Sequence, residues 1–150
     1  MNIEILQKQI DYIFSKTSAK ETKLQAICDY LENEISYYDW VGFYFKNGDR
    51  NELKLAQYTG EETEHTTIPF GKGICGQVAV SNENFVVQDV SEQDNYISCG
   101  WKVKSEIVIP IFVSNENVGQ IDIDSHTANT FTEKDEEILE YICKKVADIY

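Results

Sequence analysis

Two cysteines lie among glycines and polar residues, where a thiol is available for chemistry. Cys75 follows the sequence Gly-Lys-Gly at 71–73 and comes just before a short helical stretch expected at 77–80. The positive end of a helix dipole favours a thiolate, so this position is typical of a reactive cysteine. Cys99 lies in a polar segment without periodicity, between two strand-like runs. Both thiols are candidate nucleophiles. The alternative, that both simply pack beneath loops, stays open.

The other two cysteines belong to apolar helical stripes. Cys28 shares its stripe with leucines and isoleucines spaced three and four residues apart, and Cys143 lies in a similar stripe near the end of the chain. A free cysteine in such a stripe behaves as a small apolar residue. We therefore expect Cys28 and Cys143 to be part of the core.

Two carboxylates alternate with isoleucines in the strand-like run 119–125. Alternation sends Ile121 and Ile123 to one face and Asp122 and Asp124 to the other, about 7 Å apart by strand rise. Glu106 begins the preceding strand-like run and joins the two aspartates if the register of the hairpin permits. Three acids around one hollow would suit a ligand with an ammonium group. An exposed outer face explains the same pattern, and both interpretations stay open.

Charge and composition exclude several functions. The formal net charge is −13 without a basic cluster, so the surface repels nucleic acid and anionic lipid. No apolar run approaches the roughly 20 residues that span a bilayer, and the N-terminus lacks the features of a signal peptide. We expect a cytoplasmic protein with reduced cysteines. His65 and His126 lack zinc-type spacing, so no metal site and no cofactor are predicted.

The elements that must position these residues predict a single α+β domain over residues 1–150. Capping-box spacing at Ser18 and Glu21 predicts the start of the second helix, and Thr132 with Asp135 predicts the start of the last one. Pro110, inside a strand-like run, indicates an edge or a bulge. The predicted helices cover 3–15, 18–36 and 132–149, and the predicted strands cover 41–45, 53–58, 85–90, 107–113 and 118–124. This order favours an antiparallel sheet of five to six strands with the N- and C-terminal helices on one face.

Six segments together resemble one family of enzymes. They are Trp40–Phe45, Ile68–Gly76, Tyr96–Cys99, Ser105–Ile111, Gly119–Ser125 and Phe131–Glu136. In this order they resemble the free methionine-(R)-sulfoxide reductases, single-domain enzymes with the GAF fold. The resemblance runs from about residue 20 to the end of the chain. The last segment is common to GAF domains in general, whereas the two cysteine segments and the acidic strand are much more specific.

The resemblance implies a two-cysteine reduction of free methionine-(R)-sulfoxide. Cys99 would be the nucleophile and Cys75 the resolving thiol, and a thioredoxin-like reductant would reopen the disulfide. The resemblance also implies a homodimer and no bound cofactor.

Substrate contacts follow from the same resemblance. Glu106, Asp122 and Asp124 would bind the substrate, with Glu106 also helping to protonate the departing oxygen, and Trp40 and Tyr44 would line the methyl-sulfoxide end. This chain has His65 or its neighbour where the family carries a further cysteine, and Gly100 where the family has aspartate. A non-catalytic GAF module that binds a small ligand is the main alternative, and a cyclic-nucleotide GAF domain is a weaker one.

Overall fold

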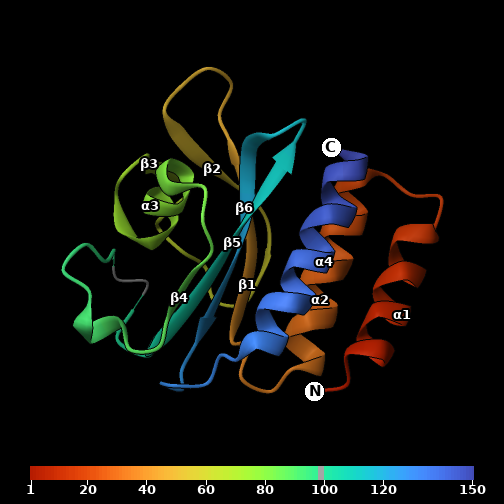
Figure 1. Ribbon diagram of the computed structural model, residues 1–150, viewed down its shortest axis with the longest axis horizontal. Coiled ribbons are helices and arrows are strands. Elements are labelled where there is room, and N and C mark those ends of the chain that lie inside the picture. Colours follow the sequence, from red (N-terminus) through yellow and green to blue (C-terminus); the bar gives the residue numbers. More distant parts are fainter. Residues whose placement is uncertain (98–99) are drawn as a thin grey trace.

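The computed structural model describes residues 1–97 and 100–150, and Figure 1 shows their arrangement. In chain order the elements are α1 (Ile3–Ser15), α2 (Lys20–Glu34), β1 (Trp40–Lys46), β2 (Glu52–Thr59), β3 (Thr67–Pro69), α3 (Gly73–Ser81), β4 (Phe85–Val87), a 3-10 turn (Val90–Glu92), β5 (Ser105–Val113), β6 (Glu116–Ser125) and α4 (Glu133–Ile149). Among the described residues, no helix combines the length and apolar character needed to cross a bilayer.

The strands form one six-stranded sheet in the order β3-β2-β1-β6-β5-β4, and every neighbouring pair is antiparallel. The predicted α+β class with an antiparallel sheet is therefore confirmed. β3 was not predicted as a strand, because three residues are too few to show an alternating pattern. β6 lies in the middle of the sheet, between β1 and β5, and its residues 118–125 are buried on both faces.

The two faces of the sheet carry different layers (Figure 1). α2 and α4 pack directly on one face, and α1 lies outside them, so the predicted placement of the terminal helices is confirmed. Ile121 and Ile123 point into this helical side and are completely buried. α3 covers the other face together with the loops around it. Cys28 and Cys143 lie in the helical core, as predicted.

The two predicted helix caps have different outcomes. Thr132 and Asp135 form the predicted capping box at the start of α4, where the Thr132 amide donates to Asp135 Oδ2 at 2.8 Å. The cap predicted at Ser18 is wrong. Ala19 is the N-cap of α2, since its carbonyl accepts the first helical hydrogen bond, from the Lys23 amide at 3.1 Å. Ser18 therefore lies one residue outside the helix.

The segment around Cys75 also differs from expectation. α3 begins at Gly73, four residues before the predicted start, so Cys75 lies in its first turn rather than in a loop before it. The strand predicted over 85–90 ends at Val87 in the structure, because Asp89 caps the following turn by accepting from the Ser91 amide at 3.0 Å. β4 pairs only with Glu106–Val108 of β5, so Pro110 lies beyond its end, in the local edge position predicted.

Candidate active site

The central strands place three carboxyl groups on the face of the sheet opposite to α2 and α4. Glu106 on β5 pairs directly with Asp124 on β6, and Asp122 lies two residues away on the same face. Each of the three residues is only 3% exposed. The interpretation of these acids as an exposed outer face is therefore wrong, because α3 and the neighbouring loops cover them. Burying three carboxyl groups together is energetically unfavourable, and such clusters are typical of functional sites.

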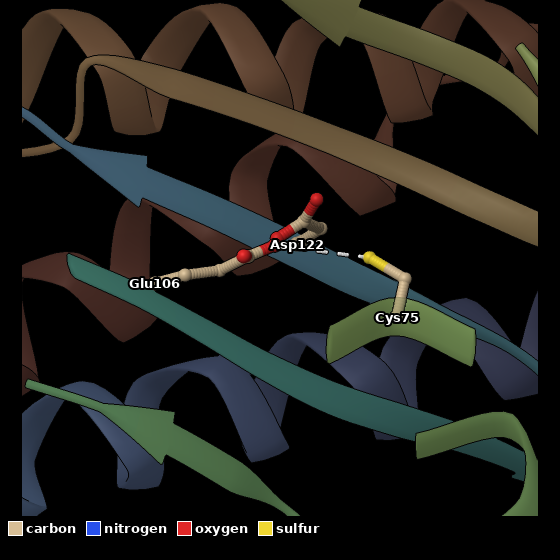
Figure 2. Close-up of side chains that lie close together, drawn as sticks. All are labelled: Cys75, Glu106 and Asp122. Carbon is tan, nitrogen blue, oxygen red and sulfur yellow. Dashed lines mark hydrogen bonds between the residues drawn. The ribbon is translucent and has the colours of Figure 1, made fainter. Parts of the chain in front are cut away.

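Cys75 points from α3 into this acidic cluster. Its Sγ donates to Glu106 Oε2 at 3.8 Å, and the ligand-capable atoms of Cys75, Glu106 and Asp122 all lie within 4.8 Å of one another. Figure 2 shows the three side chains converging from α3, β5 and β6. Gln120, which sequence reasoning missed, fixes the helix here because its amide donates to the Cys75 carbonyl at 3.1 Å. The alternation that revealed Asp122 extends to Gln120 and was the available signal.

Burial and charge keep the Cys75 side chain protonated. Burial raises the pKa of the Cys75 thiol well above its usual value, and the neighbouring carboxyl groups of Asp122 and Glu106 raise it further. The sequence prediction of a thiolate favoured by the helix dipole is therefore wrong, because desolvation and nearby acids outweigh the dipole. Burial also raises the pKa of Asp122, although hydrogen bonds with Glu106 and Cys75 act in the opposite direction.

Trp40 and Tyr44 come from β1, the other neighbour of β6. Trp40 pairs with Asp124, so both aromatic side chains share the face of the acids. Their polar atoms hold the loop 60–66: Trp40 Nε1 donates to the Glu61 carbonyl at 3.0 Å, and Tyr44 Oη donates to the His65 carbonyl at 2.8 Å. The two aromatic residues thus form one wall of the site beside the acids, and they also position the loop 60–66 that covers it.

A glycine makes room for the indole ring of Trp40. A Cβ at Gly42 would come within 2.3 Å of Trp40 Cη2, so only glycine lets the ring lie across the strand. The ring also stacks on Tyr58, with centroids 5.5 Å apart and an interplanar angle of 20°. The wall is therefore a packed aromatic surface rather than a mobile side chain.

Two adjoining hollows meet at Tyr44 and Asp122. Both are narrow, and the first is the larger of the two. The predicted site residues that line them are Trp40, Tyr44, Cys75, Glu106, Asp122 and Asp124. His126, which also lines the first hollow, is held next to the start of β1 because its amide donates to Oδ2 of Asp39, the residue before that strand, at 2.7 Å.

Cys99, the remaining predicted site residue, lies outside the described residues. The segment that leads to it is bound to the segment that carries Cys75. Asn95 Oδ1 accepts from the Gly73 amide at 2.9 Å, and Asn95 Nδ2 donates to the Gly71 carbonyl at 2.8 Å. Ile97, two residues before Cys99, packs so closely on Gly73 that a Cβ there would come within 2.9 Å of Ile97 Cγ1.

Comparison with known proteins assigns this chain to a family. Residues 19–149 match the GAF domain family. GAF domain-containing protein A of Dictyostelium discoideum is 33% identical over 94% of this chain and 87% of its own length. Free methionine-R-sulfoxide reductase of Escherichia coli (strain K12) is 32% identical over 79% of this chain and 70% of its own length.

A solved structure gives the same result. The free methionine-R-sulfoxide reductase from Neisseria meningitidis, in complex with its substrate, superposes with a TM-score of 0.91 at 30% identity, covering 98% of this chain and 87% of that one. The chain belongs to the GAF domain family, and its relationship to the free methionine-R-sulfoxide reductases within that family is confirmed.

Proposed function

We propose that this protein reduces free methionine-(R)-sulfoxide to methionine with the thiols of Cys99 and Cys75. The observation that carries the proposal is the convergence of Cys75, Glu106 and Asp122, whose reactive atoms lie within 4.8 Å of one another beside a hollow. A module that only binds a ligand has no need of a buried thiol at this place. The named activity of the Escherichia coli and Neisseria meningitidis relatives supports the same function.

The first step of the proposed reaction takes place at the sulfoxide. The Cys99 sulfur attacks the sulfoxide sulfur, and the oxygen leaves the substrate and remains on Cys99 as a sulfenic acid. Methionine is released, so the substrate gains two electrons and Cys99 loses two. Glu106 lies on β5 and lines the second hollow. Its carboxyl group is therefore placed to pass a proton to the departing oxygen.

Cys75 then resolves the sulfenic acid. Its sulfur attacks the Cys99 sulfur, a disulfide forms, and the Cys75 proton leaves with the hydroxyl group as water. The raised pKa of Cys75 suits this role, because the thiol stays protonated and does not compete as the first nucleophile. A thioredoxin-type dithiol would reduce the disulfide by exchange, which requires a reducing compartment such as the cytoplasm.

The remaining site residues would hold the free amino acid. The carboxyl groups of Asp122 and Asp124 are suited to the substrate ammonium group, which a residue inside a protein chain does not possess. The packed rings of Trp40 and Tyr44 offer an apolar surface to the methyl-sulfoxide end. We therefore expect preference for the free amino acid over methionine sulfoxide within a peptide. A homodimer, expected from the family, stays a prediction that sedimentation would test.

Activity assays with cysteine variants test the proposal. Reduced protein is incubated with free methionine-(R)-sulfoxide, its (S) epimer or a peptide that contains the sulfoxide, and released methionine is measured. We expect turnover of the free (R) form with thioredoxin, loss of all activity in Cys99→Ser, and a single turnover in Cys75→Ser. Cys28→Ser, which changes a buried core thiol, is the matched control and keeps turnover. Failure of the wild type to release methionine would leave a GAF module that binds a small ligand.

A further inference from the structure

We propose that the reduced protein binds one Zn²⁺ or Cd²⁺ ion through Cys75 Sγ and the carboxyl groups of Glu106 and Asp122, and that the ion blocks the reductase site reversibly. The binding stands on the geometry alone. The inhibition rests on the proposed function.

The distances between the three donor atoms fit a tetrahedral ion. Zinc lies about 2.3 Å from a cysteine sulfur and about 2.0–2.2 Å from a carboxylate oxygen. These bonds at a tetrahedral angle separate the sulfur from the oxygen by roughly 3.5 Å. Cys75 Sγ and Glu106 Oε2 are already 3.8 Å apart, and all three donors fall within 4.8 Å. Small side-chain shifts would therefore complete the coordination.

A second observation points to a ligand at this place. Asp122 Oδ1 is buried and has no hydrogen-bond partner within the described part of the chain, although the residue is only 3% exposed. A buried carboxylate oxygen without a partner is unfavourable, and a cation would satisfy it. Figure 2 shows the Asp122 side chain in the same group as those of Cys75 and Glu106.

The donor set selects the kind of ion. A thiolate favours soft or borderline cations such as Zn²⁺ and Cd²⁺, whereas Mg²⁺ and Ca²⁺ prefer six or more oxygen ligands. Three protein ligands leave the fourth position of a tetrahedron open to water in the second hollow, which all three residues line. The sequence shows no metal-binding spacing here, because the three ligands come from separate elements, α3, β5 and β6.

Binding requires no redox step. The ion replaces the Cys75 proton, a sulfur–metal bond forms, and the proton passes to solvent. In this state Cys75 has no free thiol to resolve a sulfenic acid, and Glu106 and Asp122 are not available to the substrate. A chelator reverses both effects.

Calorimetry on variants tests the binding. The protein is reduced, freed of reductant under anaerobic conditions and titrated with ZnCl₂, and Cd²⁺ titration is followed through thiolate-to-metal absorption. We expect one ion per chain and no binding in Cys75→Ser. In Asp122→Asn we expect the affinity for the ion to fall by about tenfold or more. Cys143→Ser, a buried thiol on the helical side, is the control that keeps binding. Circular dichroism verifies that each variant is folded.

Two results would overturn the proposed site: zinc binding that survives in folded Cys75→Ser, or no binding to the wild type. Turnover is then measured separately with zinc and after EDTA. Loss of methionine release with zinc and its recovery with EDTA support the inhibitory role, and zinc binding without inhibition overturns that part. If the wild-type protein binds one zinc ion but never releases methionine, the proposed function is contradicted and the metal site stands. Failure of the metal site and failure of the proposed function are therefore distinguishable.

Discussion

Ile97 packs directly on Gly73, and this contact joins the segment leading to Cys99 with the first turn of the helix that carries Cys75. Gly73 has a φ of +63°, a conformation in which glycine is nearly free of strain, and it leaves no space for a side chain beneath Ile97. Asn95 reinforces the junction through hydrogen bonds to Gly71 and Gly73. The two-cysteine account depends on this junction, because disulfide formation requires Cα atoms within about 7 Å.

Gly73→Ala is expected to impair the step between the two thiols. The added Cβ meets Ile97, so the segment before Cys99 must move away from α3. Alanine at this positive φ also lowers the free energy of unfolding by about 1 kcal/mol. We expect the rate of disulfide formation in a single turnover to fall about tenfold or more, because a misplacement of about 1 Å can have such an effect. Rapid quenching followed by mass spectrometry measures that rate.

Gly48→Ala is the matched control for this substitution. Gly48 has a φ of +60° and nothing within 4 Å of the position of a Cβ. It should therefore lose a similar amount of stability, about 1 kcal/mol, while its rate of disulfide formation stays unchanged. Equal loss of that rate in both variants would show that strain alone is responsible and that the Ile97 contact has no role.

Tyr44→Phe tests the loop that covers the first hollow. The substitution removes only the hydroxyl group that donates to the His65 carbonyl, so the loop 60–66 loses one of its two aromatic anchors. We expect faster amide hydrogen exchange in 60–66, a loss of about 1 kcal/mol in the free energy of unfolding, and a severalfold lower kcat/KM. Tyr12→Phe, in which a 59% exposed tyrosine of α1 changes, serves as control. Unchanged exchange in 60–66 would contradict the anchoring role.

Asp122→Asn is expected to stabilise the fold and impair the reaction. Burial raises the pKa of Asp122, so the folded state disfavours its charge at neutral pH, and an amide of the same shape removes that cost. We expect a gain of about 1 kcal/mol at pH 7 together with at least a tenfold loss of turnover. Since the group is protonated in both states at low pH, the gain should disappear below about pH 3.8. Urea unfolding at pH 7 and pH 3 measures it, with Asp49→Asn in an exposed turn as control.

Alkaline conditions should weaken the fold through its buried thiols. Burial raises the pKa of Cys28 and of Cys143 far above the ordinary value of 9.0. The unfolded chain releases these protons above pH 9 while the folded chain keeps them, so this stabilisation is complete below pH 9 and is lost as the pH rises. Each thiol accounts for about 1.4 kcal/mol at pH 10. Cys143→Ala should therefore lose less stability than the wild type between pH 8 and pH 10, and parallel pH curves would contradict this.

Strand alternation predicted part of the site, and helix capping predicted part of the fold. Asp122 and Asp124 were placed on one face by the period of a strand, and the box at Thr132 was found because cap and helix are adjacent in the chain. The position of Cys75 was predicted only approximately. Glycine before a helix signals a start, but α3 already begins at Gly73, the second of the two glycines that precede Cys75.

Other features depend on contacts between distant segments, and no local pattern reveals them. The raised pKa of Cys75 arises from carboxyl groups on β5 and β6, which meet the thiol only in the folded chain. The double role of Trp40, as wall and as anchor of Glu61, depends on the space above Gly42. Ser18 failed as a cap because the carbonyl of the next residue, Ala19, starts the helix.

Peptide mapping after a single turnover tests the two-cysteine account most directly. The reduced protein receives one equivalent of free methionine-(R)-sulfoxide without reductant, is quenched by alkylation and is digested for mass spectrometry. The two-cysteine mechanism predicts one equivalent of methionine and a disulfide between Cys75 and Cys99, with Cys28 and Cys143 alkylated only after unfolding. Methionine release with Cys75 and Cys99 still in the thiol state, or a disulfide that excludes either of them, would contradict it.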